Sequence, residues 1–403
     1  MRGPHVIFGI GLFLNIIPLA KAPALDLNNI DQLKKAASAA MSNLMSYYSP
    51  SYRGAFDTDI TPWQDSLMIW SLHFDYASDV GDTRYLATVQ NALYRQSNNQ
   101  SHSFLVKNVV EQWNGGILWG AEWSFTLTLE AVAAAEFLGP QAKLPKSSAT
   151  WIGLAQKTLQ QVAPQTDNGC GGGLFWYRNR EDPKHGRYKA FNTNTEFISA
   201  AARSFLITKD TKVLGFAQQL VDWLIGPSRL ADVKTGILQD GVDAKDASCQ
   251  LSTDQWTYNY GLWLGSMAWL FKATGDQKYL TMASTVFTHS VKIFAPKGII
   301  AEICEPTSCS RDSKGFKAVY IRNLVYLHRV TTDQAMKTAI QNLIDTSVKA
   351  MAQTSCDAKF NCAAAWAAGS PPEKNVRSQH VSTALLVAAI GIRKPPANAA
   401  RAT

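Results

Sequence analysis

The feature that most constrains the fold is a recurrence of amphipathic helical segments separated by similar turns. Apolar residues return every three or four positions in the segments 67–76, 127–137, 198–206, 214–224 and 262–271, which is the spacing of one helix face. Alternation of apolar and polar residues, which is typical of half-buried strands, is scarce. The sequence therefore predicts an all-α protein.

The turns between these segments share a pattern. Each of the segments 80–83, 208–211 and 274–277 contains an Asp, and two of them contain a Gly. Gly is suited to ending one helix and Asp to capping the next. Asp210 lies 128 residues after Asp82 and 66 residues before Asp276, which indicates a unit of about 64 residues. A further turn is then expected near Ser148, and Thr332-Asp333 is expected to begin another unit.

A unit of this length holds two helices, and stacked helical hairpins form either an open solenoid or a closed ring. The loops 167–189 and 240–260 are long, aromatic and rich in Gly, which favours a ring whose loops gather at one end. With 46% hydrophobic and 17% charged residues among 403, the chain can bury a large core, and wholesale disorder is excluded. We expect one large domain over residues 25–392.

The N-terminus has the layout of an export signal. Arg2 precedes an apolar run over residues 6–19, and the small residues Ala20, Ala22 and Ala24 follow. The run of about 14 residues is short for a membrane span of about 20. The sequence predicts a secretory signal peptide over residues 1–24, with an N-terminal anchor helix as the alternative. Residues 393–403 are basic, lack the apolar tail of a GPI signal, and are expected to form a short disordered tail.

Six cysteines fit an exported, extracellular or cell-wall protein, because an even number in such a chain indicates disulfides. Six cysteines allow 15 pairings. Short spacings favour the pairs Cys304–Cys309 and Cys356–Cys362, which leaves Cys170–Cys249. A metal site is the less favoured reading, since neither Cys-x-x-Cys nor His-x-x-x-His occurs. Asn99 begins a glycosylation sequon in a polar segment.

The charge is moderate and dispersed. Lys and Arg number 39 against 31 Asp and Glu, a formal net charge of +8 without runs of like charge. This argues against a nucleic-acid partner and fits weak attraction to an anionic surface such as a phosphorylated cell wall. We expect a monomer.

Aromatic residues divide into two groups. Sugar faces stack on aromatic rings, and their hydroxyls need polar partners. The loops supply such a mixture, and the predicted glycan-binding residues are Trp176, Tyr177, Asn194, Gln255, Trp256, Tyr258 and Asn259. Other tryptophans lie on predicted helices among apolar neighbours and are expected in the core: Trp70, Trp223, Trp263 and Trp269.

Several segments between about residues 40 and 390 resemble glycoside hydrolase family 76, the endo-α-1,6-mannanases of bacteria and fungal cell walls. They are CGGGLFW at 170–176, Tyr188-Lys189 with Asn194 and AAAR at 200–203, QWTYNYG at 255–261, Glu305-Pro306, FKA at 316–318 with Arg322, and Gln379 with Ala384-Leu385. The resemblance implies an (α/α)6 toroid, an α-1,6-mannan substrate bound in part by Arg322, and no metal or cofactor. It is similar to the secreted fungal branch.

The chain departs from this family at the catalytic pair. Members carry two adjacent Asp residues, nucleophile and acid/base, in an Asn-Asp-Asp-Gln context. The corresponding stretch here, residues 112–124, aligns either Glu122-Trp123 or Gly115-Gly116 with the pair. Glu122 is the remaining candidate for the acid/base. Its partner carboxylate would come from Asp240 or Asp65, with Glu111 as a further alternative.

Two functions follow from this sequence. The first is an endo-α-1,6-mannosidase or transglycosidase that uses Glu122 with Asp240 or Asp65. The second is a carbohydrate-binding protein that has kept the mannan groove and lost the catalytic pair.

Overall fold

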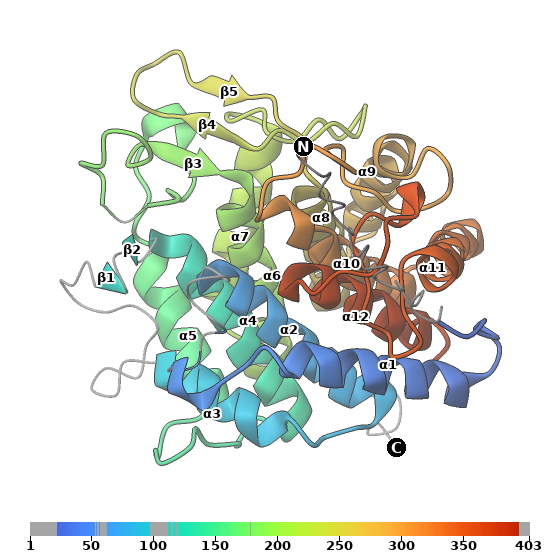
Figure 1. Ribbon diagram of the computed structural model, residues 1–403. Coiled ribbons are helices and arrows are strands. Elements are labelled where there is room, and N and C mark those ends of the chain that lie inside the picture. The colour runs from blue at the N-terminus through green and yellow to red at the C-terminus, as the bar shows by residue number, and fades with distance from the viewer. Residues whose placement is uncertain are drawn as a thin grey trace, which may run out of the picture.

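The computed structural model describes residues 22–52, 54, 56, 63–96, 112–113, 116–117, 120–177 and 179–394. Within these residues most of the regular secondary structure is helical, so the all-α prediction is confirmed (Figure 1). The helices are α1 (Ile30–Met45), α2 (Trp63–Val80), α3 (Leu86–Gln96), α4 (Gly120–Leu138), α5 (Trp151–Val162), α6 (Phe191–Thr208), α7 (Thr211–Ile225), α8 (Thr257–Thr274), α9 (Lys278–Phe294), α10 (Lys317–Val330), α11 (Gln334–Thr354) and α12 (Val376–Gly391).

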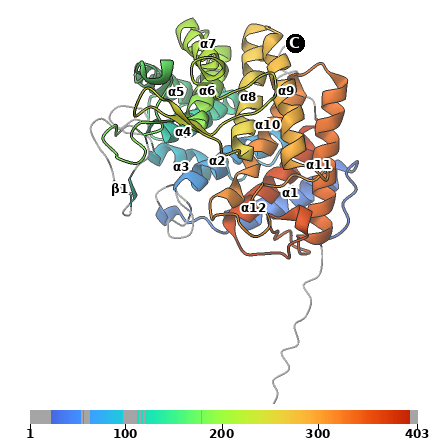
Figure 2. The same ribbon diagram turned by 90° about the horizontal axis from the view of Figure 1, so that it is seen from above.

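The even-numbered helices, which we call the core helices, pack on one another in order. Each contacts the next one along the chain, and α12 contacts α2, so that these contacts form a closed cycle. The odd-numbered helices pack on their core neighbours. The first helix, α1, packs on the last, α12, which brings the two ends of the described chain together (Figures 1 and 2).

The predicted turns are confirmed. Asp210 caps α7 by accepting hydrogen bonds from the backbone of Lys212 and Val213. Asp333 caps α11 in the same way, and Thr150 caps α5, the helix expected after Ser148. Gly275 ends α8 in the left-handed conformation at φ 74°, where glycine is favoured.

The core helices run parallel, since their beginnings meet one another and so do their ends. The rings of Phe191 and Trp263, near the starts of α6 and α8, lie 6.0 Å apart. Arg203, near the end of α6, reaches Glu136 near the end of α4. Arg329 near the end of α10 pairs with Asp79 near the end of α2. The core therefore has an N-terminal end and a C-terminal end.

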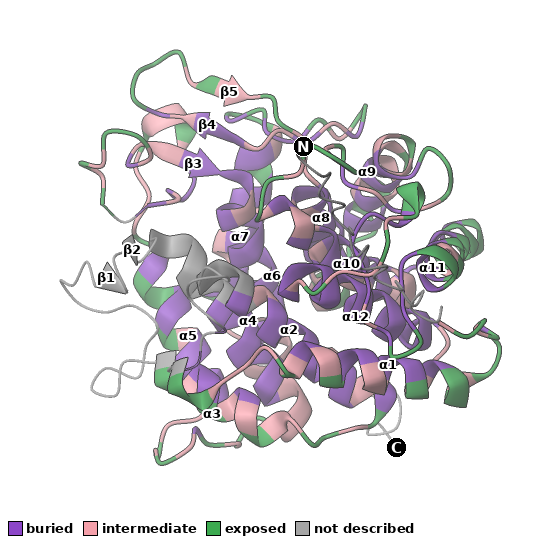
Figure 3. Cartoon of the chain, viewed as in Figure 1, coloured by how far each residue is buried: buried purple, intermediate pink, exposed green. Residues whose placement is uncertain are grey.

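A single cluster of buried apolar residues extends from Leu27 in the N-terminal segment to Ile392 (Figure 3). Trp70, Trp223 and Trp263 are buried in it, as predicted. Trp269 packs against this cluster, as predicted, but it is only partly buried and also lines a cavity.

A small antiparallel sheet lies in the loops that the sequence analysis left without strands. It pairs β3 (Tyr188–Ala190) with β4 (Gly241–Asp243), and β4 with β5 (Gln250–Ser252). Strands of three residues are too short to show an alternating pattern. Two further short strands, β1 (Gln112–Trp113) and β2 (Gly116–Ile117), form a separate pair.

The three cysteine pairs favoured by spacing are present as disulfides: Cys170–Cys249, Cys304–Cys309 and Cys356–Cys362. Among the helices of the described chain, none is both long and apolar enough to cross a membrane.

Candidate functional site

Three hydrogen-bond donors converge on the carboxylate of Asp240 at the N-terminal end of the core. The Tyr258 hydroxyl donates to Oδ1 at 2.6 Å and the Asn259 Nδ2 donates to the same oxygen at 2.9 Å. The Tyr188 hydroxyl donates to Oδ2 at 2.9 Å. Asp240, Tyr258 and Asn259 were all predicted as site residues, and the structure brings them together. We call these four residues the Asp240 cluster.

The sheet and the start of α6 position Asp240. Its backbone carbonyl accepts from the Phe191 N–H at 2.8 Å, and its N–H donates to the Ser252 carbonyl. The next residue, Gly241, allows the Tyr188 ring to pack closely, because a Cβ there would lie 2.4 Å from the ring. Burial and the charge of Asp240 raise the pKa of Tyr188. This hydroxyl therefore remains protonated and a donor near neutral pH.

A buried carboxyl group that the sequence analysis missed holds the first turn of α8, which carries Tyr258 and Asn259. Glu302 accepts from the Thr257 hydroxyl at 2.5 Å and from the Thr257 N–H. Burial raises the pKa of Glu302 to about 7. One signal could have found it, because a lone Glu follows the apolar stretch 299–301. Glu302 thus satisfies a backbone donor at the start of α8.

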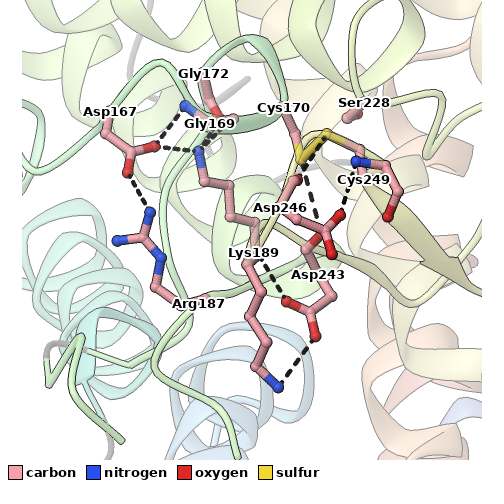
Figure 4. Close-up of a disulfide and its surroundings, with 12 residues drawn as sticks. Asp167, Gly169, Cys170, Gly172, Arg187, Lys189, Ser228, Asp243, Asp246 and Cys249 are labelled. Atoms are coloured by element: carbon pink, nitrogen blue, oxygen red, sulfur yellow. Dashed lines mark hydrogen bonds and ion pairs between the residues drawn. A yellow bond between two sulfur atoms is a disulfide. The ribbon is translucent and has the colours of Figure 1, made fainter. Parts of the chain in front are cut away.

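Lys189, whose side chain is completely buried, holds the glycine-rich loop before β3; its ammonium points at this loop (Figure 4). It donates to the Asp167 carboxylate at 2.8 Å and to the carbonyls of Gly169 and Gly172 at 2.6 and 2.5 Å. The Cys170–Cys249 disulfide ties the same loop to the segment between β4 and β5 (Figure 4).

Asn194 also holds this loop. It is fully buried, accepts from the Leu174 N–H at 2.8 Å, and donates to the carbonyls of Leu174 and Ala190. Its side chain has no route to a bound sugar in this arrangement. We therefore correct its predicted sugar-binding role to a supporting one.

The predicted aromatic residues form two separate groups. The rings of Trp176 and Tyr177 lie 4.9 Å apart, and both pack on His185. Trp176 is partly exposed, whereas Tyr177 is buried. In the second group, Trp256 and Tyr258 both pack edge-on against Phe316, at centroid distances of 5.7 and 4.6 Å.

Gln255 and Arg322 make their hydrogen bonds to residues other than Asp240. The Gln255 side chain accepts from the Tyr260 hydroxyl at 2.7 Å. The Arg322 guanidinium donates to Asp75 at 2.7 Å and to the Ser71 carbonyl at 2.6 Å, between α10 and α2. Because Arg322 is held in this ion pair within the core, the structure does not place it with the Asp240 cluster.

The side chains of Glu122 and Asp65, although they belong to α4 and α2, lie outside the described part of the structure, as does Asn99. The described residues contain no group of three or more His, Cys, Asp or Glu able to hold a metal ion.

The chain resembles fungal proteins along most of its length. It is 27% identical to the mannan endo-1,6-alpha-mannosidase DCW1 of Saccharomyces cerevisiae, over 83% of this chain and 73% of the relative. It is 26% identical to a putative mannan endo-1,6-alpha-mannosidase of Schizosaccharomyces pombe, over 86% of this chain and 77% of the relative.

Solved structures share its fold. Dfg5 from Chaetomium thermophilum, in complex with glucosamine, superposes with a TM-score of 0.81 at 21% identity, covering 92% of this chain and 93% of that one. An inactive variant of an α-1,6-mannanase of Salegentibacter, in complex with α-1,6-mannotriose, superposes with a TM-score of 0.73 at 16% identity, covering 89% and 99%. The family model described as glycosyl hydrolase family 76 matches residues 32–399. This match spans most of the chain, which therefore belongs to glycosyl hydrolase family 76.

Proposed function

We propose that the protein acts on α-1,6-linked mannan of the fungal cell wall as an endo-α-1,6-mannosidase. The observation that carries this proposal is the Asp240 cluster, in a chain of family 76 whose fungal relatives bear that name. A carboxylate oxygen accepts more than one hydrogen bond, and Oδ2 of Asp240 accepts one within the cluster. It therefore has capacity left for a sugar hydroxyl.

We infer that the fold is a single (α/α)6 toroid over residues 25–392. The closed cycle of contacts between the parallel core helices supports this inference. So does the pairing of α1 with α12, because it completes a sixth hairpin from the two ends of the chain. In this arrangement the Asp240 cluster lies at the rim where the core helices begin.

Glu122 and Asp240 are the carboxyl groups that we propose for catalysis. Glu122 belongs to the first turn of α4. Tyr258, which donates a hydrogen bond to Asp240, belongs to the first turn of α8. Both therefore come from the N-terminal end of the core. A glycosidase needs one carboxyl group to protonate the leaving oxygen and a second to act as nucleophile or base. Glu122 takes the first role in this proposal and Asp240 the second; Asp65 in the first turn of α2 is the alternative partner.

A mannan-binding protein without catalysis is the second candidate. It is favoured by one observation: residues 112–124 contain Glu122 but no second carboxyl residue beside it. Such a protein would bind the polymer through Asp240 and the aromatic residues Trp176, Trp256 and Tyr258 and release no product.

The test incubates the protein with α-1,6-mannotetraose and follows shorter products by chromatography, while calorimetry measures binding. We expect products from the wild type and none from Glu122→Gln, with binding retained in the variant. Binding without products in the wild type would select the second candidate. Absence of both would contradict the mannan assignment itself.

Asp240→Asn and Asp243→Asn form a matched pair for the same assay. Asp243 lies three residues along, in β4, and is paired with Lys245 at the surface. Loss of a charge-assisted hydrogen bond should weaken mannotetraose binding about tenfold in Asp240→Asn. Asp243→Asn should bind as the wild type does.

We further propose that the protein is exported to the cell wall as a monomer, after cleavage of residues 1–24, and that Asn99 is glycosylated. The likeness to fungal mannan endo-1,6-alpha-mannosidases and the disulfides support export. N-terminal sequencing of secreted protein, its mass before and after deglycosylation, and light scattering test these three statements.

A further inference from the structure

A cavity lies at the C-terminal end of the core, away from the Asp240 cluster at the N-terminal end. Its volume is about 630 Å³, and it is lined by residues from the last turns of α2, α4, α6, α8 and α10. Trp269 of α8 lines it, eleven residues after Tyr258 on the same helix. At 1.5 Å per residue, the two positions are about 16 Å apart along the helix axis. A volume of this order is typical of pockets that bind small organic molecules.

The walls of this C-terminal cavity are aromatic. Phe74, Phe137 and Phe271 line it with Trp269. Phe137, Phe271 and Trp269 are only partly buried although they are large and apolar. An apolar molecular body that entered the cavity would remove part of this surface from water, which is favourable in proportion to the area covered.

The acidic groups of the cavity are already paired. Glu136 accepts two hydrogen bonds from Arg203, at 2.7 and 3.2 Å. Asp75 accepts from Arg322 at 2.7 Å and from the Tyr326 hydroxyl at 2.8 Å. Because these carboxylates already accept hydrogen bonds from Arg203, Arg322 and Tyr326, no cationic ligand is needed to pair with them.

Two hydrogen-bond donors of residues that line the cavity, in contrast, have no acceptor within the described chain. The Trp269 Nε1 and the Arg329 Nε are both buried and have no hydrogen-bond partner within the described chain. Buried donors of this kind are normally satisfied, and leaving one unpaired is costly. The ammonium of Lys272 lies 5.0 Å from the centre of the Trp269 ring. Lys272 is exposed, and no salt bridge to a described residue involves it; the carboxylate that attracts it, Glu136, already accepts two hydrogen bonds from Arg203.

We propose that the C-terminal cavity binds a small organic carboxylate with an apolar body. The carboxylate accepts hydrogen bonds from Lys272, Trp269 and Arg329, and the body packs on the phenylalanine side chains. This assignment needs neither Glu122 nor Asp240 and holds whether or not the protein cleaves mannan.

The probe that tests it is 4-phenylbutyrate, compared with its neutral amide and with the cationic 4-phenylbutylamine. These three molecules share one apolar body and differ in the charge of the head group. Calorimetry should give one site per chain for the carboxylate. The amide should bind about tenfold more weakly, because it lacks a charge-assisted hydrogen bond, and the amine should bind more weakly still.

Variants locate the site. Lys272→Met keeps the aliphatic stem and should weaken phenylbutyrate binding about fivefold, the effect of a partly exposed charge pair. The matched control is Lys292→Met, an exposed lysine of α9 that does not line the cavity, and it should bind normally. Asp240→Asn should also bind phenylbutyrate normally. The proposal is overturned by absence of phenylbutyrate binding, by equal affinities for the three probes, by unchanged binding in Lys272→Met, or by loss of binding in Asp240→Asn.

Discussion

At the scale of single residues, two cations beside the same carboxylate differ in how much they contribute to the stability of the fold. Lys189 is completely buried and Arg187 is 39% exposed, yet both pair with Asp167 (Figure 4). Burial lowers the pKa of Lys189, against the pull of Asp167. The charge is tolerated because the ammonium also donates to two carbonyls of the glycine-rich loop. A buried ion of this kind is costly to leave half-paired.

We therefore expect Lys189→Met to lower the free energy of unfolding by about 3 kcal/mol, because it removes the three hydrogen bonds by which this buried ammonium holds the glycine-rich loop. Arg187→Met, which removes an exposed partner of the same carboxylate, should cost less than about 1 kcal/mol. Urea unfolding followed by circular dichroism measures both values. Equal losses in the two variants would contradict the role given to burial.

At the scale of elements, the small sheet depends on one close approach. Gly241 in β4 packs against the Tyr188 ring of β3. Gly241→Ala should displace this ring and remove its hydrogen bond to Asp240, so mannotetraose binding should fall by about fivefold or more. The control is Gly215→Ala in α7, where an added Cβ meets nothing within 4 Å. It should stabilise the helix by about 0.5–1 kcal/mol and leave binding unchanged.

The disulfides provide a second prediction at this scale. Cys170–Cys249 closes a segment with a sequence separation of 79, and Cys304–Cys309 one of only 5. By the chain-entropy argument, removing the first should cost about 4.5 kcal/mol and removing the second about 2 kcal/mol. Unfolding of the two Cys→Ser pair variants compares these costs. The reverse order would show that the chain-entropy account does not describe this protein.

The same scale shows what the sequence could predict. Helices and their turns follow from apolar spacing and from Asp or Gly at fixed positions, so α7 after Asp210 was foreseeable. Tyr258 and Asn259 were also found, because their motif stands out. The third donor to Asp240, Tyr188, lies 52 residues from it along the chain. Asn194 was misassigned because it was predicted in a loop, whereas it lies in the first turn of α6 and is buried.

At the scale of the whole molecule, stability should depend on buried groups with displaced pKa values. Burial raises the pKa of Glu130 and Glu302 from 4.5 to about 7, and that of Asp79 from 3.8 to about 6. The folded state therefore holds more protons than the unfolded state between about pH 4.5 and 7. Across that interval these carboxyl groups make stability fall as the pH rises.

Buried histidines act in the opposite direction. Burial lowers the pKa of His73 and His328 from 6.5 to about 4, and that of His380 to about 3. Here the unfolded state binds the extra protons, so stability rises with pH between about 4 and 6.5. The two sets oppose each other from about pH 4.5 to 6.5. Below about pH 4.5 the histidines determine how stability changes with pH, and above about pH 6.5 the carboxyl groups determine it.

We therefore expect a broad maximum of thermal stability between about pH 4.5 and 6.5, with losses on both sides. Glu302→Gln mimics the protonated side chain, so its stability relative to the wild type should improve as the pH rises from 5 to about 8. Melting temperatures of both proteins across this range, with the exposed Glu181→Gln as control, provide the measurement. If the difference in melting temperature between Glu302→Gln and the wild type did not change with pH, Glu302 would already be ionised in the folded protein at pH 5. Its buried contacts to Thr257 would then be those of a carboxylate across the whole range.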